Sequence, residues 1–138
     1  MGIKNKIVAS GCVIISDGKL LVSNDGKDEF FKIPGGKVKE KESLEVCALR
    51  ELKEETGFEG KIISKLLTMK LNKKPGTGEE INVSLYHFKS ELKNFHRDFN
   101  SFEHNNHQVE WVPLDEIEKG KIEVAPNIKF LLEKGELK

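Results

Sequence analysis

The sequence predicts a single α+β domain. Apolar, β-branched runs separated by turn residues open the chain, one capped helix occupies its middle, and further strand-like runs follow the helix. The chain has 138 residues, a length that suits one domain spanning 1–138 with its own hydrophobic core.

The first half is expected to fold into a hairpin, a short strand and the helix. Asp17-Gly18 lies between two apolar runs, which is typical of a two-residue hairpin turn. Ser43 can cap the helix, and Gly57 suits the position just after its last turn. The expected elements are strands at 6–15, 20–22 and 30–33 and a helix at 43–56.

The second half is expected to alternate strands and loops before two short helices. The polar segments 72–80 and 94–108 show no clear periodicity, so we expect both to be loops. Pro126 is well placed in the first turn of the last helix. The expected elements are strands at 61–71, 81–89 and 109–112, a helix that opens at 113–117 and a helix that begins near Pro126.

Composition excludes several classes of protein. Lys and Arg number 23, as do Asp and Glu, so the chain lacks the basic excess of a general nucleic-acid-coating protein. Cys12 and Cys47 form neither a disulfide framework nor a CxxC zinc pair, and we expect buried thiols in a reducing compartment. No apolar run approaches the ~20 residues that span a bilayer. We therefore expect a cytoplasmic protein that binds neither membranes nor nucleic acid polymers.

The predicted helix carries an acidic face. Glu51, Glu54 and Glu55 have the spacing i, i+3 and i+4, with Arg50 at the edge of their face. The apolar side is predicted to comprise Val46, Ala48, Leu49 and Leu52. Three neighbouring carboxylates repel one another, so this face is either solvated or a site for a hard divalent cation.

Residues around this helix follow a longer pattern with fixed gaps. In order, the pattern consists of Gly36, Glu42, Arg50-Glu51-Leu52, Glu54-Glu55 and Gly57-Phe58. It fills every position of the Nudix box at 36–58, and the chain resembles the MutT-like Nudix hydrolases. The preceding strands, the Pro34-Gly35-Gly36 turn and the later segment around Trp111 are also similar to the layout of that family.

The resemblance implies an α/β/α sandwich around a mixed β-sheet. It also implies a hydrolase that cleaves a nucleoside diphosphate linked to another moiety, by attack of water on a pyrophosphate phosphorus. The implied cofactor is Mg²⁺, with Mn²⁺ as a possible substitute, because such a cation neutralises phosphate charge and lowers the pKa of bound water. The implied partner is a small nucleotide, and the protein is expected to be a monomer or a homodimer.

The resemblance also assigns roles to residues of the box. The implied metal ligands are the Gly35 carbonyl, Glu51, Glu54 and Glu55, and the implied catalytic residues are Arg50, Glu51 and Glu54. Arg50 is expected to hold the acidic face through a bidentate contact, with Glu42 and Gly36 in support. Glu42 is alternatively a first-turn helix charge. The resemblance leaves open which glutamate is the general base.

A further acidic ligand is expected from the segment that follows the box. Glu103 is the preferred candidate because we expect it in a loop, whereas Glu110 is more typical of a strand surface. His104 and His107 are either exposed loop histidines or residues that contact the phosphate or the base or assist the general base. Trp111 is expected in the core, and the residues that bind the nucleobase are left unassigned.

The sequence indicates the family but leaves several substrate classes open. Nucleoside triphosphates come first, since no motif diagnostic of another substrate is present. ADP-ribose or a nucleotide sugar is the alternative, because Pro75 lies close to the position of a proline in ADP-ribose-cleaving members. Another class is a catalytically silent Nudix-fold nucleotide-binding module, although the intact segment 50–55 argues against it.

Overall fold

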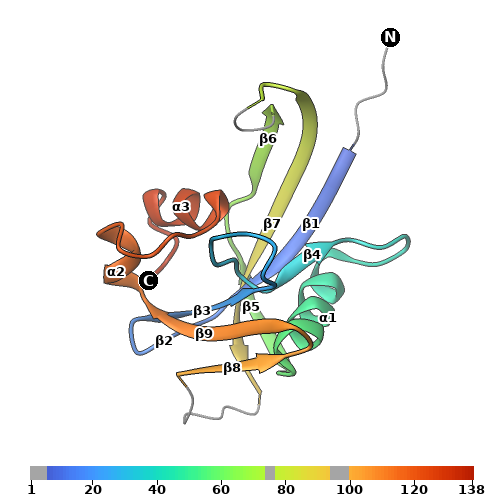
Figure 1. Ribbon diagram of the computed structural model, residues 1–138. Coiled ribbons are helices and arrows are strands. Elements are labelled where there is room, and N and C mark those ends of the chain that lie inside the picture. Colours follow the sequence, from blue (N-terminus) through green and yellow to red (C-terminus); the bar gives the residue numbers. More distant parts are fainter. Residues whose placement is uncertain (1–5, 74–76, 94–99) are drawn as a thin grey trace.

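Two β-sheets meet at the centre of the molecule, and helices cover them on both sides (Figure 1). The computed structural model describes residues 6–73, 77–93 and 100–138. The described residues confirm the α+β class and the mixed sheet. No helix in the described part of the chain is long and apolar enough to cross a membrane.

The first sheet is mixed. Its strands are β4 (Gly35–Lys37), β1 (Lys6–Val13), β7 (Glu80–Leu92), β5 (Gly60–Lys65) and β6 (Met69–Lys73). The β1–β7 pair is parallel, whereas β4 pairs antiparallel with β1, and both β5 and β6 pair antiparallel with β7. This arrangement places Gly35 and Gly36, the first two residues of β4, at one edge of the sheet, beside α1 (Leu44–Thr56).

The second sheet is antiparallel in each of its pairs. Its strands, in spatial order, are β2 (Ile15–Ser16), β3 (Lys19–Asn24), β9 (His107–Pro113) and β8 (Ser101–His104). Asp17 and Gly18 adopt φ angles of 51° and 73° between β2 and β3, which confirms the predicted hairpin. The chain leaves the first sheet at Val13 and enters the second at Ile15, so the predicted strand 6–15 is two strands.

Successive side chains of β1 and β3 point to opposite faces of the strands, and this divides the core into two clusters. Cys12 and Leu21 pack with Ala48 and Leu52 of α1. Their neighbours pack with the other two helices, α2 (Leu114–Glu118) and α3 (Pro126–Glu133), in a cluster that includes Val13, Leu20, Val22, Ile117, Ile128 and Leu131. Because α1 lies on one side of the strands and α2 and α3 on the other, the predicted sandwich is confirmed (Figure 1).

The helix ends are as predicted. The Ser43 hydroxyl accepts a hydrogen bond from the Val46 N–H, and Gly57 ends α1 with a φ of 81°. Pro126 occupies the first turn of α3. Cys12 and Cys47 are fully buried, and burial raises the pKa of each thiol to about 11, so both remain neutral.

Three strand and loop predictions are wrong. The predicted strand 61–71 breaks between β5 and β6, where the Leu66 N–H and the Leu67 carbonyl bond to His87. The strand predicted at 30–33 reduces to isolated bridges at Phe31 and Lys32. The loop predicted at 94–108 contains β8 and the start of β9, although 94–99 lie outside the described residues.

The turn between β8 and β9 explains the last difference. Asn105 and Asn106 adopt φ angles of 48° and 65°, a conformation that asparagine tolerates better than most residues. An Asn-Asn pair can therefore close a two-residue hairpin without glycine. The polar composition of this segment reflects a solvated hairpin and not an irregular loop.

Candidate active site

Part of the acidic side of α1 is buried, in contrast to the helical-wheel prediction from the sequence. The buried stripe of α1 is centred on Ala48 and Glu55, since Cys47, Ala48, Leu52 and Glu55 are all buried. Val46, predicted on the apolar side, lies opposite this stripe and is 56% exposed. The fully solvated acidic face is therefore excluded for Glu55.

Glu55 is fixed by two donors from outside its helix. Its side chain is almost fully buried, and its Oε1 accepts a hydrogen bond from the Ser23 hydroxyl at 3.0 Å. Its Oε2 accepts from the Gly35 N–H at 3.1 Å. The last turn of α1 is thereby joined to β3 and to the glycine turn, which holds this carboxyl group in one orientation.

Glu51 lies next to Glu55 and close to Gly36. A Cβ atom at Gly36 would lie 2.5 Å from the Glu51 Cδ, so a larger residue there would displace this carboxylate from its position. Desolvation, followed by a hydrogen bond with Glu51, raises the pKa of Glu55 to about 8. At neutral pH the Glu55 carboxyl group of the metal-free protein therefore keeps its proton.

Arg50 organises the remaining carboxylates. Its Nε and Nη2 donate to the two oxygens of Glu42 at 2.6 and 3.0 Å, which is the bidentate contact that the resemblance implied. Its Nη1 donates to Glu51 at 2.8 Å and to Glu54 at 3.0 Å. The Arg50 contact is the main cause that lowers the pKa of Glu42 to about 2. Four charged side chains thus form one network along this face of α1.

The donor set suits a hard divalent cation. Glu51, Glu54 and Glu55 line one cavity of about 250 Å³, together with Ser23, Asp25, Lys32, Ile33, Gly35, Asn105 and His107. In the described part of the chain, no three acidic, histidine or cysteine side chains converge on a single point. Arg50 accounts for this, because it draws Glu51 and the half-exposed Glu54 toward itself. The oxygen-only carboxylates fit Mg²⁺ or Mn²⁺, and Glu55 would lose its proton on binding either cation.

The β8–β9 hairpin does not bring Glu103 to this cavity. Phe102 packs edge-on against Phe58 with ring centroids 5.7 Å apart, and the His104 ring lies beside Gly57. Because side chains alternate along a strand, Glu103 lies on the opposite face of β8, where it is exposed. Glu110 also lies outside the cavity lining.

The same hairpin contributes His107 and Asn105 instead. The Asn105 side chain donates to the Glu54 carbonyl at 3.2 Å, which docks the turn on α1. The His107 Nδ1 lies 2.9 Å from the Asn105 carbonyl, an acceptor only, so Nδ1 carries the hydrogen. The Nε2 atom then faces Glu55 Oε1 at 3.9 Å. Of the two predicted histidines, His107 is the one that lines the acidic cavity.

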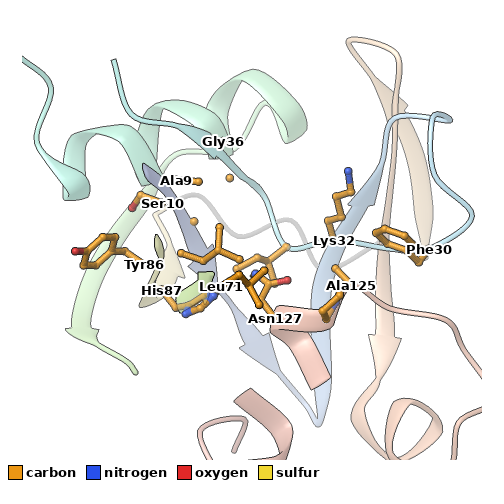
Figure 2. Close-up of a pocket in the computed structure, with 15 residues that line it drawn as sticks. Ala9, Ser10, Phe30, Lys32, Gly36, Leu71, Tyr86, His87, Ala125 and Asn127 are labelled. Atoms are coloured by element: carbon orange, nitrogen blue, oxygen red, sulfur yellow. Dashed lines mark hydrogen bonds between the residues drawn. The ribbon is translucent and has the colours of Figure 1, made fainter. Parts of the chain in front are cut away.

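A second, mainly apolar cavity of about 340 Å³ adjoins the acidic one (Figure 2). Lys32, Ile33 and Gly35 line both cavities. The other residues that line the apolar cavity are Ala9, Ser10, Gly11, Phe30, Gly36, Leu71, Leu85, Tyr86, His87, Ala125, Pro126 and Asn127.

The sequence alone gave no indication of several of these residues. Ser23, Lys32, His87 and Asn127 lie far from the box in sequence and belong to no spacing pattern. The pairing of β1 with β7, the bridge between Ser23 and Lys32 and the docking of α3 bring them to the two cavities. Trp111 is partly buried and packs against the core cluster beneath α1, as predicted.

Comparison with known proteins gives a family and a fold. The NUDIX domain model matches residues 5–132. A NUDIX hydrolase from Nitrosomonas europaea aligns with a TM-score of 0.74 at 21% identity, covering 94% of this chain and 87% of its own. The E. coli ORF135 protein aligns with a TM-score of 0.66 at 24% identity, covering 94% and 88%. A MutT NUDIX hydrolase from Burkholderia pseudomallei aligns with a TM-score of 0.64 at 21% identity, covering 81% and 86%. No curated protein sequence matches the chain.

Proposed function

Because the chain belongs to the NUDIX domain family, whose enzymes hydrolyse phosphoanhydride bonds, we propose that it cleaves nucleoside triphosphates to the monophosphate and pyrophosphate. One observation carries this proposal. An apolar cavity and an acidic cavity share a wall made of Lys32, Ile33 and Gly35. A nucleotide has the matching division, since its base presents two broad aromatic faces to an apolar cavity and its phosphate chain binds divalent cations.

The sizes of the two cavities favour a triphosphate over ADP-ribose or a nucleotide sugar. The apolar cavity, at about 340 Å³, suits one nucleoside. The acidic cavity is smaller, at about 250 Å³, and three carboxylates line it. A short phosphate chain with its cation fills such a space better than a second sugar does.

Lys32 lies where the phosphate chain would leave the apolar cavity. Its Nζ lies 2.5 Å from Asp28 and 5.6 Å from the centroid of the Phe30 ring. The Lys32–Asp28 pair is partly exposed and therefore weak, so the ammonium can exchange Asp28 for a phosphate oxygen. Lys32 is thus proposed to bind the substrate between its base and its reacting phosphate.

The carboxylates of α1 have separable roles in this proposal. Glu51, Glu54 and Glu55 would hold Mg²⁺, or Mn²⁺ in its place, with the Gly35 carbonyl as a further oxygen donor. When bound, the cation supplies charge neutralisation and a more acidic water. Glu55 is held rigidly by Ser23 and Gly35, whereas the Glu54 side chain is 48% exposed. Glu54 can therefore turn toward the attacking water and take its proton.

Arg50 and Glu42 are proposed to position these glutamates. The guanidinium contacts Glu42, Glu51 and Glu54 at once, so it sets the spacing of the acidic side chains before substrate binds. Glu103 could reach the cavity only after movement of the β8–β9 hairpin. His107 needs no such movement, and its Nε2 can hold a proton beside Glu55.

A substrate panel tests the proposal. Purified protein with Mg²⁺ is given ribo- and deoxyribonucleoside triphosphates, ADP-ribose and nucleotide sugars, and the products are identified by mass. We expect a monophosphate and pyrophosphate from at least one triphosphate, and no turnover in chelator. Preferred cleavage of ADP-ribose or a nucleotide sugar would replace the proposed substrate. Tight nucleotide binding without turnover of any substrate would instead indicate the silent binding module.

A further inference from the structure

His87 is a fully buried histidine of β7 that lines the apolar cavity. Its Nδ1 lies 2.7 Å from the Leu67 carbonyl oxygen, in the break between β5 and β6. Its Nε2 lies 3.1 Å from the Asn127 side-chain nitrogen, in the first turn of α3. The His87 ring therefore links the break between β5 and β6 to the first turn of α3.

Chemistry fixes the direction of both hydrogen bonds. A backbone carbonyl can only accept, so the hydrogen of His87 must be on Nδ1. Desolvation lowers the pKa of His87, so the ring is neutral and its Nε2 carries a lone pair. Asn127 must then present its NH₂ group to the ring, because its carbonyl oxygen would meet that lone pair.

This bond also fixes the other end of the Asn127 amide. With the nitrogen directed at His87, the Asn127 oxygen points away from the ring, toward the side of the cavity where Lys32 and Phe30 lie (Figure 2). Among the residues that the structure describes, the hydrogen bond of the Asn127 side chain is the one to His87, and no buried side-chain oxygen lacks a partner, so the Asn127 oxygen is accessible to a ligand. The apolar cavity thus offers a ligand one oriented acceptor.

We propose that His87 is a positioning residue that fixes Asn127 as an acceptor, so that the cavity selects nucleobases bearing an exocyclic amino group. The inference rests on the proposed function, because it assigns the apolar cavity to the base of a nucleotide. Cytosine and adenine present an amino donor at positions where uracil and hypoxanthine present a carbonyl acceptor. A carbonyl there would face the Asn127 oxygen, and turning the amide would break its bond to His87.

Two nucleotide pairs isolate this single difference. CMP and UMP differ at the 4-position, and AMP and IMP differ at the 6-position, with little change in size within each pair. Dissociation constants of these monophosphates are measured by calorimetry, and kcat/KM is measured for the corresponding triphosphates. We expect the amino member of at least one pair to bind about 10-fold more tightly or better, with the same sign in kcat/KM.

Variants test whether His87 sets the preference. His87→Leu leaves the Asn127 amide free to turn, so the ratio within the pair should fall below about 3-fold. His87→Gln can donate to Leu67 and accept from Asn127, so it should restore the preference. Asn127→Leu, at the surface-accessible start of α3, should abolish the preference even if His87→Leu fails to fold. Asn82→Leu, which removes an exposed amide elsewhere on β7, is the matched control and should leave it unchanged.

The outcomes separate the inference from the proposed function. Triphosphate hydrolysis without an amino preference overturns the inference alone. An amino preference in binding without triphosphate hydrolysis supports the inference and overturns the proposed function, whereas no nucleotide binding overturns both. Nitrogen NMR of the free protein adds a direct readout, since a His87 ring protonated on Nε2 would contradict the proposed orientation.

Discussion

The Ser23 hydroxyl donates a hydrogen bond to Glu55 Oε1 at 3.0 Å, and this bond joins strand β3 to the last turn of α1. It belongs to a small set of contacts that hold a buried carboxyl group in place. The Gly35 N–H supplies the second contact at 3.1 Å. The protein thus keeps Glu55 oriented at a site where burial alone favours its protonated form.

Glu55 should make the stability of the metal-free protein fall as the pH rises. Its folded pKa is about 8, above the ordinary value of 4.5, so the folded state holds a proton that the unfolded state has lost between these values. Stability from this group is complete below pH 4.5 and is lost as pH rises through 8. Melting curves in chelator should therefore show a falling Tm over this range, less steep in Glu55→Gln. Glu45→Gln, on the exposed first turn of α1, is the control. Equal slopes in wild type and Glu55→Gln would contradict the shifted pKa.

Mg²⁺ should stabilise the folded protein. The acidic cavity exists only in the folded state, so binding raises stability by mass action, by about 2.7 kcal/mol at 100 times the dissociation constant. The gain should be larger at alkaline pH, where Glu55 has already lost its proton. We expect a Tm several degrees higher in Mg²⁺ than in chelator and a smaller difference in Glu51→Gln. An unchanged Tm would mean that metal binding requires substrate phosphates.

Arg50→Lys should impair catalysis more than stability. Lysine keeps the charge but loses the planar fork that contacts Glu42, Glu51 and Glu54 together. We expect kcat to fall about 10- to 100-fold while Tm changes by only a few degrees. Lys53→Met is the control, since Lys53 pairs with exposed Glu59 on the solvent side of α1. Full activity of Arg50→Lys would show that the network does not position the glutamates.

The β8–β9 hairpin offers two competing candidates. The sequence favours Glu103 as an extra metal ligand, whereas the geometry favours His107, whose Nε2 lies 3.9 Å from Glu55. His107→Gln should lower kcat by about 10-fold, and Glu103→Gln should leave it within about 3-fold, because only His107 lines the cavity. Steady-state kinetics at saturating Mg²⁺ distinguish them. The reverse result would require the hairpin to move when substrate binds.

Local signals account for what could be predicted of the fold. The Asp17-Gly18 turn, the Ser43 cap and the Gly57 stop depend on a few neighbouring residues, and each has the predicted conformation. The break after β5 depends on bonds from Leu66 and Leu67 to His87, which is distant in sequence. No local pattern reports such contacts, so the strand appeared continuous.

The residues of the candidate site also divide into those that local sequence patterns predict and those that depend on distant contacts. Arg50, Glu51, Glu54 and Glu55 lie within two turns of one helix, whose geometry sets their relative positions, so their grouping on α1 was predictable. Ser23, Lys32 and Asn127 reach the cavities from three other segments. Their contribution depends on strand pairing and helix docking. Glu103 was expected in a loop for a related reason, since the direction of its side chain follows from a hairpin that the polar composition did not indicate.

The central claim is that the carboxylates of α1 perform Mg²⁺-dependent phosphoanhydride hydrolysis. The most direct measurement is kcat for Glu54→Gln beside Glu45→Gln, on the best triphosphate at saturating Mg²⁺, with Tm measured in chelator. The two variants make the same chemical change on the same helix, one inside the acidic cavity and one outside it. We predict that Glu54→Gln lowers kcat by about 100-fold or more with its Tm held or raised, and that Glu45→Gln changes neither. Retention of more than about a third of wild-type kcat in Glu54→Gln would contradict the claim.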